Sequence, residues 1–203
     1  MAFYRAEWGT TDIKAQGIMT VGKLAKRRCA ARSHGGRREN CGAVENSDHI
    51  SVELAPRATE EVRDLIRELD RVLSAEYSPE QRHGLSLEAI FQPHIRFFLA
   101  RLDGVAIGCG GVVLFEDFAE VKRMYVRDVA RGRGVGQALL TRIEAEALKA
   151  GLALLRLETG ERQVAALRLY QRAGFQPCAA FAPYTTMAPQ AIVASAFMEK
   201  RLK

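Results

Sequence analysis

The sequence lacks both a long apolar segment and a closely spaced pair of cysteines. No run approaches the ~20 apolar residues of a membrane-spanning helix, so we expect no transmembrane segment and no membrane partner. The four cysteines contain no CxxC pair, which argues against a disulfide scaffold or a zinc ribbon. Arg5, Glu7 and Asp12 interrupt the stretch in which a secretory signal would need an apolar core. These features predict a cytoplasmic protein with reduced thiols.

Acidic residues are missing from one part of the chain. Residues 23–38 hold seven of the basic side chains and no acid, in a protein of 203 residues with a net charge of +6. Such a run is typical of a nucleic-acid-binding arm or of a solvated extension. The run has no interleaved aromatics and contains Gly35 and Gly36, which favours the extension, and a translation start at Met19 is a third alternative. We predict a flexible basic extension over residues 1–49, a single domain over residues 50–203, and no nucleic-acid partner.

Hydrophobic periodicity predicts mixed secondary structure after residue 49. Apolar residues alternate over residues 50–54, as in a half-buried strand, and Thr59 precedes a helical repeat of apolar positions that ends near residue 73. The same criteria predict a short helix at residues 86–91, strands at 95–102, 105–114 and 119–126, a helix at 134–150, a strand at 152–158, a helix at 164–173, a strand after Phe175 and a strand at 194–198. This order predicts an α/β (α+β) fold with a partly antiparallel sheet and helices packed on it.

Glycines interrupt the strand predicted at residues 105–114. Gly108, Gly110 and Gly111 surround Cys109, and glycine inside a strand indicates a bulge or the close approach of another group. We interpret Cys109 as a buried, inert thiol rather than a nucleophile.

A second group of glycines leads directly into the helix predicted at residues 134–150. Small residues at positions 132, 134 and 136 let a ligand approach the backbone, and the unpaired N–H groups of a first helical turn attract anions. Arg131 and Arg133 add positive charge, so a phosphate or pyrophosphate is the expected ligand. The dinucleotide fingerprint GxGxxG fails in both registers, and no GK[ST] follows for a P-loop.

Two segments resemble the GNAT N-acetyltransferase superfamily. Arg131-x-x-Gly134-x-Gly136 matches the R/Q-x-x-G-x-G/A signature of that superfamily, and residues 163–175 resemble its N-x-x-A-x-x-L-Y-x-x-x-G-F segment. Gln163 stands where the asparagine is usual, and the matching positions of the second segment are Ala166, Leu169, Tyr170, Gly174 and Phe175. The resemblance implies a GNAT-like, mostly antiparallel sheet flanked by helices, with splayed central strands. It also implies acetyl-CoA as the acyl donor and no metal.

The resemblance further implies a cofactor site. Pantetheine would pair with the backbone of residues 124–126, and the pyrophosphate would bind the N–H groups of residues 132–137. The N–H of Val126 or of a neighbour would polarise the thioester carbonyl. The implied cofactor-binding residues are Met124, Tyr125, Val126, Arg131, Gly132, Arg133, Gly134, Val135, Gly136, Gln137, Gln163 and Tyr170.

Acetyl transfer to an amine requires a proton acceptor and a proton donor. By resemblance Tyr170 is the general acid, with packing beside the cofactor as the alternative. Glu120 is the first choice for the general base and Glu158 the second, and each has a structural role as its alternative. His83 and His94 have no triad or metal spacing and are interpreted as structural or surface residues. Residues 181–184 either shape the acceptor pocket or close the core.

The predicted function is the direct transfer of an acetyl group from acetyl-CoA to a primary amine of a small-molecule or amino-acid-like acceptor. A lysine or N-terminal amine of a protein is the alternative acceptor. A noncatalytic acyl-CoA sensor and a nucleic-acid-binding protein are alternatives from other classes, and a homodimer stays open.

Overall fold

The computed structural model describes residues 49–203, so the predicted basic extension lies outside the described residues. A seven-stranded sheet has the order β1-β2-β3-β4-β5-β7-β6. Only β4 and β5 are parallel neighbours within it, which confirms the prediction of a mostly antiparallel sheet. The strands are β1 (Ile50–Leu54), β2 (Ile95–Leu102), β3 (Val105–Leu114), β4 (Ala119–Val126), β5 (Leu154–Gly160), β6 (Gln176–Pro177) and β7 (Ser195–Arg201).

Helices and short 3-10 turns connect these strands. The helices are α1 (Glu60–Glu76), α2 (Val135–Lys149), α3 (Val164–Arg172) and α4 (Pro189–Ile192), and the turns are η1 (Pro79–Gln81), η2 (Ala89–Phe91), η3 (Asp128–Ala130) and η4 (Tyr184–Thr186). The prediction of a helix at residues 86–91 is wrong, because only the three-residue turn η2 forms there. Gly84 and Pro93, with Ser86 between them, favour turns over a longer helix in the segment between η1 and β2.

The start of α1 follows from its sequence. The Thr59 hydroxyl accepts a hydrogen bond of 3.3 Å from the N–H of Val62, and Glu60 and Glu61 lie in the first turn, where the helix dipole favours acids. The buried face consists of Val62, Leu65, Ile66 and Leu69. These residues recur at helical spacing, so α1 presents one apolar face to the sheet.

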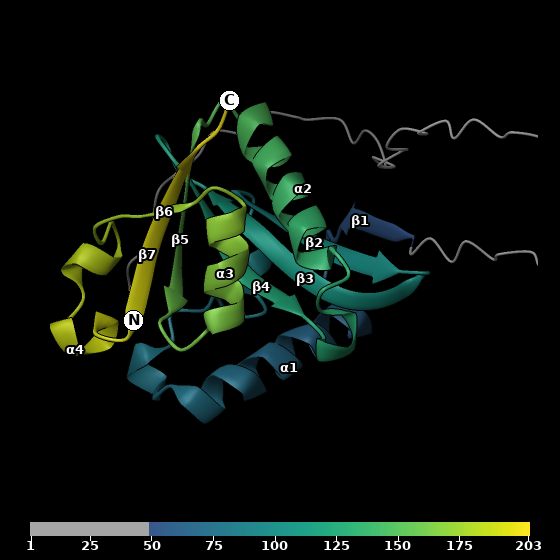
Figure 1. Ribbon diagram of the computed structural model, residues 1–203, viewed down its shortest axis with the longest axis horizontal. Coiled ribbons are helices and arrows are strands. Elements are labelled where there is room, and N and C mark those ends of the chain that lie inside the picture. Colours follow the sequence, from purple (N-terminus) through teal and green to yellow (C-terminus); the bar gives the residue numbers. More distant parts are fainter. Residues whose placement is uncertain (1–48) are drawn as a thin grey trace, which may run out of the picture.

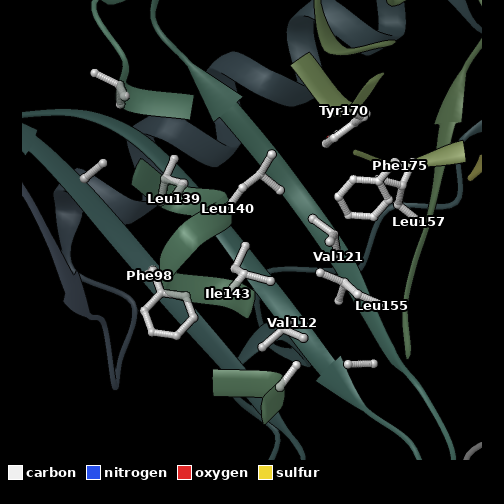
Figure 2. Close-up of a cluster of buried hydrophobic side chains, with 14 of the residues drawn as sticks. Phe98, Val112, Val121, Leu139, Leu140, Ile143, Leu155, Leu157, Tyr170 and Phe175 are labelled. Atoms are coloured by element: carbon white, nitrogen blue, oxygen red, sulfur yellow. The ribbon is translucent and has the colours of Figure 1, made fainter. Parts of the chain in front are cut away.

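The helices cover opposite faces of the sheet. In β2, Phe97 and Leu99 pack in the core beneath α1, whereas the alternating Phe98 and Ala100 pack in the core beneath α2 and α3. Figure 1 shows α2 and α3 side by side on one face, and Figure 2 shows the apolar side chains between them and the sheet.

The glycines of β3 allow both a bulge and a close approach, as predicted. The β3–β4 register shifts between Cys109 and Gly111, and Arg123 on the facing strand has a positive φ of 57°. A Cβ at Gly108 would lie 2.8 Å from the carbonyl oxygen of Tyr125, and one at Gly110 would overlap the Met124 sulfur. A larger residue at Gly108 would therefore push β4 away from β3, and one at Gly110 would require the Met124 side chain to move.

The parallel strands β4 and β5 pair over only three residues. Ala119 to Val121 pair with Leu155 to Leu157, and no pairing continues beyond them. The strands therefore splay after Val121 and Leu157, as the resemblance implied. The edge of β4 that faces β5 has no strand partner from residue 122 onward.

Candidate active site

A pocket lies where β4 and β5 separate. Residues of α1 and α3 both line it, and these helices cover opposite faces, so the pocket extends through the sheet at the splay. Its lining residues are Leu69, Leu73, Tyr77, Gln81, Arg82, His83, Gly84, Val121, Lys122, Arg123, Met124, Glu158, Thr159, Gly160, Gln163, Ala166 and Tyr170. Concave sites of this kind, with a few polar groups among apolar ones, are typical of small-molecule binding.

The glycine loop before α2 has the geometry of an anion site. Gly132 and Gly134 have positive φ values of 79° and 88°, a conformation that favours glycine. The amides of Val135, Gly136 and Gln137 in the first turn have no backbone acceptor within residues 49–203. These donors, the helix dipole and the exposed loop fit a pyrophosphate, while the unpaired edge of β4 fits an extended amide chain. The residues present therefore suit coenzyme A.

Arg131 adds a side-chain charge to this loop. Arg131 forms an ion pair of 2.8 Å with Asp128, and half of its side chain is exposed. Its charge is therefore partly compensated by Asp128.

Tyr170 reaches the pocket from α3. It is buried, and its ring packs edge-on against Phe175 with centroids 5.7 Å apart (Figure 2). Its hydroxyl has no hydrogen-bond partner within the described part of the chain. Burial, and then the nearby charge of Glu158, raise the pKa of the phenol above its usual value. Tyr170 thus keeps its proton at neutral pH and directs an unused donor at the pocket.

Glu158 enters the pocket from β5. Leu155 and Leu157 pack in the core beneath α2 and α3, so strand alternation turns the Glu158 side chain toward the face of α1. Its carboxylate accepts a hydrogen bond of 2.6 Å from Ser195. Burial raises the pKa of Glu158, opposed by that hydrogen bond and by Lys122 and His83. A carboxylate with a raised pKa is a stronger base than an exposed one.

Glu120 has a different environment from Glu158. It lies inside the three-residue stretch in which β4 and β5 pair, is 1% exposed, and is not among the residues that line the pocket. Its Oε1 accepts a 2.6 Å hydrogen bond from the Tyr184 hydroxyl and forms an ion pair of 2.8 Å with the Lys122 ammonium. Glu158 is the first β5 residue beyond that paired stretch. The splay therefore exposes Glu158 to the pocket and leaves Glu120 in the core.

The end of α1 closes one wall of the pocket, which sequence reasoning missed. The Tyr77 hydroxyl accepts a 2.9 Å hydrogen bond from the N–H of Arg162, and Gln163 donates a 2.6 Å bond to Glu76. Gln163 therefore holds α3 to α1 in this structure. Helical periodicity placed α1 but gave no sign of this long-range contact.

The other candidates lie around the pocket or in the core. His83 lines the pocket and contacts the carbonyl oxygen of Ala191 at 2.9 Å, and His94 is partly buried with a pKa lowered by burial. Cys109 is buried, and burial raises its pKa to about 12, as expected of an inert thiol. Phe181 and Tyr184 belong to a buried aromatic cluster, so this segment closes the core.

Residues 49–203 contain neither a cluster of metal ligands nor a membrane-spanning helix. No three His, Cys, Asp or Glu side chains among them are grouped as metal ligands would be. None of the helices in this range is long and apolar enough to cross a bilayer.

Comparison with known proteins decides the family. The Acetyltransferase (GNAT) family matches residues 60–175, a range that includes the splayed strands, the glycine loop and Tyr170. The chain belongs to the GNAT family. It is therefore an acetyl-CoA-dependent acyltransferase.

Relatives of this GNAT protein include named acetyltransferases. An IAA acetyltransferase of Azospirillum brasilense is 44% identical over 143 residues, which cover 70% of this chain and 90% of the relative. An uncharacterized N-acetyltransferase of Bacillus subtilis is 36% identical over 109 residues, covering 52% of this chain and 72% of the relative.

Solved structures share the fold of this GNAT protein. An acyl-CoA N-acyltransferase structure from Klebsiella pneumoniae has a TM-score of 0.60 and 34% identity, and covers 76% of this chain and 98% of its own. A PaiA N-acetyltransferase from Thermoplasma acidophilum, in complex with coenzyme A, has a TM-score of 0.56 and 21% identity, with coverages of 74% and 99%. The second likeness shows the fold alone.

Proposed function

We propose that this protein transfers the acetyl group of acetyl-CoA directly to a primary amine of a small-molecule or amino-acid-like acceptor. The observation that carries the proposal is that Tyr170 and Glu158 line one pocket and reach it from opposite faces of the sheet. Acyl transfer to an amine needs a proton donor on the side of the leaving group and a proton acceptor on the side of the nucleophile.

The pKa shifts of the two side chains agree with these two roles. Glu158, directly or through a water molecule, takes a proton from the acceptor ammonium, whose reference pKa is about 10.4 for a lysine-like amine. The amine nitrogen then forms its bond to the acyl carbon as the bond to sulfur breaks. Tyr170 gives its proton to the departing thiolate, and the phenolate then takes up the second proton that the nitrogen loses as the amide forms, directly or through water. The raised pKa of each group keeps Tyr170 protonated and strengthens Glu158 as a base.

Acetyl-CoA supplies an activated acyl group, and this chain positions it. We assign the pyrophosphate to the amides at the start of α2 and the pantetheine to the unpaired edge of β4, near Met124 and Val126. No cysteine of residues 49–203 lines the pocket, and Cys109 is buried elsewhere with a raised pKa, which favours direct transfer over an acyl-cysteine intermediate.

A small acceptor fits the closed wall at the end of α1. Tyr77 and Gln163 tie this wall to the segment between β5 and α3, which limits the room for a protein substrate. The relative from Azospirillum brasilense, named an IAA acetyltransferase, agrees with a small-molecule acceptor.

Release of free thiol from acetyl-CoA across a panel of primary amines tests the proposal. We expect turnover of a small amine. Glu158→Gln should abolish this turnover and retain the affinity for acetyl-CoA. Binding of acetyl-CoA in a calorimetric titration, with no turnover of any amine, would overturn the proposal in favour of an acyl-CoA sensor. Turnover of lysine-containing peptides alone would identify a protein acetyltransferase.

A further inference from the structure

The α1 side of the pocket contains more basic side chains than the general base needs. Arg82, Lys122 and Arg123 all line the pocket, and the mechanism uses none of them. Each positive charge that lines a pocket is either compensated by a carboxylate of the protein or available to a ligand.

Two of these three charges are compensated. Lys122 forms an ion pair of 2.8 Å with Glu120. Arg123, whose side chain is 7% exposed, forms a 2.5 Å ion pair with Asp70 through Nη1. These two cations therefore have carboxylate partners.

Arg82 pairs with no carboxylate within the described residues. Its Nη1 donates a 2.6 Å hydrogen bond to the Ser74 hydroxyl, which is neutral. Its Nε is buried without an acceptor, as is the Nε of Arg123. Among the described residues, the pocket therefore includes a guanidinium with no ion-pair partner, since Glu80 is near enough only for its charge to interact with Arg82, and two buried N–H donors without an acceptor. Such donors are costly unless a ligand satisfies them.

Among residues 49–203, Glu158 is the only acidic residue that lines this pocket. The α1 side of the pocket thus offers one unpaired positive group, Arg82, and one negative group, Glu158. An acceptor that carries both an amine and a carboxylate would satisfy both, with its amine at Glu158.

We propose that the acceptor carries a carboxylate that binds at Arg82, beside Arg123, so that the substrate class is that of amino acids and related amino carboxylates. This inference rests on the proposed function. Guanidinium groups bind carboxylates through charge-assisted, often bidentate hydrogen bonds, so Arg82 sets specificity without taking part in the chemistry.

Kinetics with matched acceptors test the inference. The probes are the common L-amino acids and their carboxamides, which keep the amine and lose the negative charge. We expect kcat/KM for the best amino acid to exceed that for its carboxamide by about 10- to 100-fold, the effect of one hydrogen bond to a charged group. Arg82→Gln should remove this preference by lowering kcat/KM for the acid alone, and the KM for acetyl-CoA should not change.

Two further variants separate specificity from folding. Arg82→Lys keeps the charge and should restore part of the preference, even if Arg82→Gln is poorly folded. Arg57→Gln removes an equal charge from an exposed position outside the pocket. It should not change kcat/KM for the amino acid or for its carboxamide.

The outcomes also separate this inference from the proposed function. Equal use of acids and carboxamides, or an equal loss of both in Arg82→Gln, would overturn the inference while acetylation itself stands. If no amine is acetylated, the proposed function fails, and calorimetric titration of the same amino acids into the coenzyme A complex decides the inference. Binding that Arg82→Gln abolishes would support it, and absence of binding to the wild type would overturn it.

Discussion

The hydroxyl of Tyr184 donates a 2.6 Å hydrogen bond to Glu120, and both side chains are about 1% exposed. Lys122 donates to the same hydroxyl and pairs with the same carboxylate. A buried carboxylate held in this way has a counter-charge and a hydrogen-bond donor from the protein itself. Glu120 is therefore a structural acid in our proposal.

Replacement of this carboxylate should affect stability more than chemistry. Glu120→Gln leaves the partly buried Lys122 without its counter-charge, so we expect the free energy of unfolding to fall by roughly 2–3 kcal/mol. Denaturant unfolding measures this loss. The acid limb of kcat/KM should stay at its wild-type pH, and a limb that vanishes in Glu120→Gln would show that Glu120 is the base.

Glu158→Gln should have the opposite effect on the reaction. Loss of a general base lowers kcat by roughly 10²–10⁴, and we expect a loss of this size with little change in acetyl-CoA affinity. In the wild type the acid limb of kcat/KM should lie above pH 4.5, because burial raises the pKa of Glu158 from that value. A pH–rate profile checks the position of the limb, which Glu158→Gln should abolish.

The same raised pKa makes a prediction about stability. Because the folded state binds the Glu158 proton more tightly than the unfolded chain does, ionisation of Glu158 destabilises the fold as pH rises from 4.5 through the raised pKa. Glu158→Gln, which stays neutral, should be at least as stable as the wild type at pH 7 and should lose this advantage at pH 4. Thermal unfolding at both pH values tests the sign. A variant less stable at pH 7 than at pH 4, relative to the wild type, would contradict the burial argument.

Tyr170→Phe separates the hydroxyl from the ring. The ring contact with Phe175 stays, so acetyl-CoA affinity should change little, while turnover falls by roughly 10²–10⁴ if the hydroxyl is the proton donor. Calorimetric titration and steady-state kinetics give the two quantities. Unchanged turnover, measured where chemistry limits the rate, would return Tyr170 to a packing role.

The two ends of α2 provide a matched pair of glycines. Gly134 and Gly151 have positive φ values of 88° and 81°, and neither would place a Cβ within 3.4 Å of a neighbour. Valine at either position should lower stability by about 1–3 kcal/mol through backbone strain. Only Gly134→Val should raise the acetyl-CoA dissociation constant, by an order of magnitude or more, because only it displaces the anion-binding amides.

Arg131→Ala should weaken acetyl-CoA binding less than Gly134→Val does, since Arg131 is half exposed and already pairs with Asp128. Calorimetric titration of the two variants compares the losses. Equal losses would mean that side-chain charge contributes as much as the backbone. If Gly151→Val also weakens acetyl-CoA binding, the loss of affinity in Gly134→Val would come from strain in α2 and not from displaced amides.

Local signals in the sequence determined most of the fold. Apolar runs and a tight turn at residues 103–104 predicted β2, β3 and β4 with their observed bounds, and a threonine cap with a helical repeat predicted α1. The glycine spacing before α2 predicted the anion loop, because backbone conformation and helix dipole act within one turn. Tyr170 came from the resemblance of its segment.

Tertiary structure decided which acid lies in the pocket and what lies opposite it. Glu120 and Glu158 are equivalent in the sequence, each an acid within a strand, and only the end of β4–β5 pairing separates a core residue from a pocket residue. Arg82 carries no motif at all, and it lines the pocket because α1 and η1 fold back over the splay. Such contacts join residues far apart in the chain, where no local periodicity acts, so only the packed sheet and helices determine them.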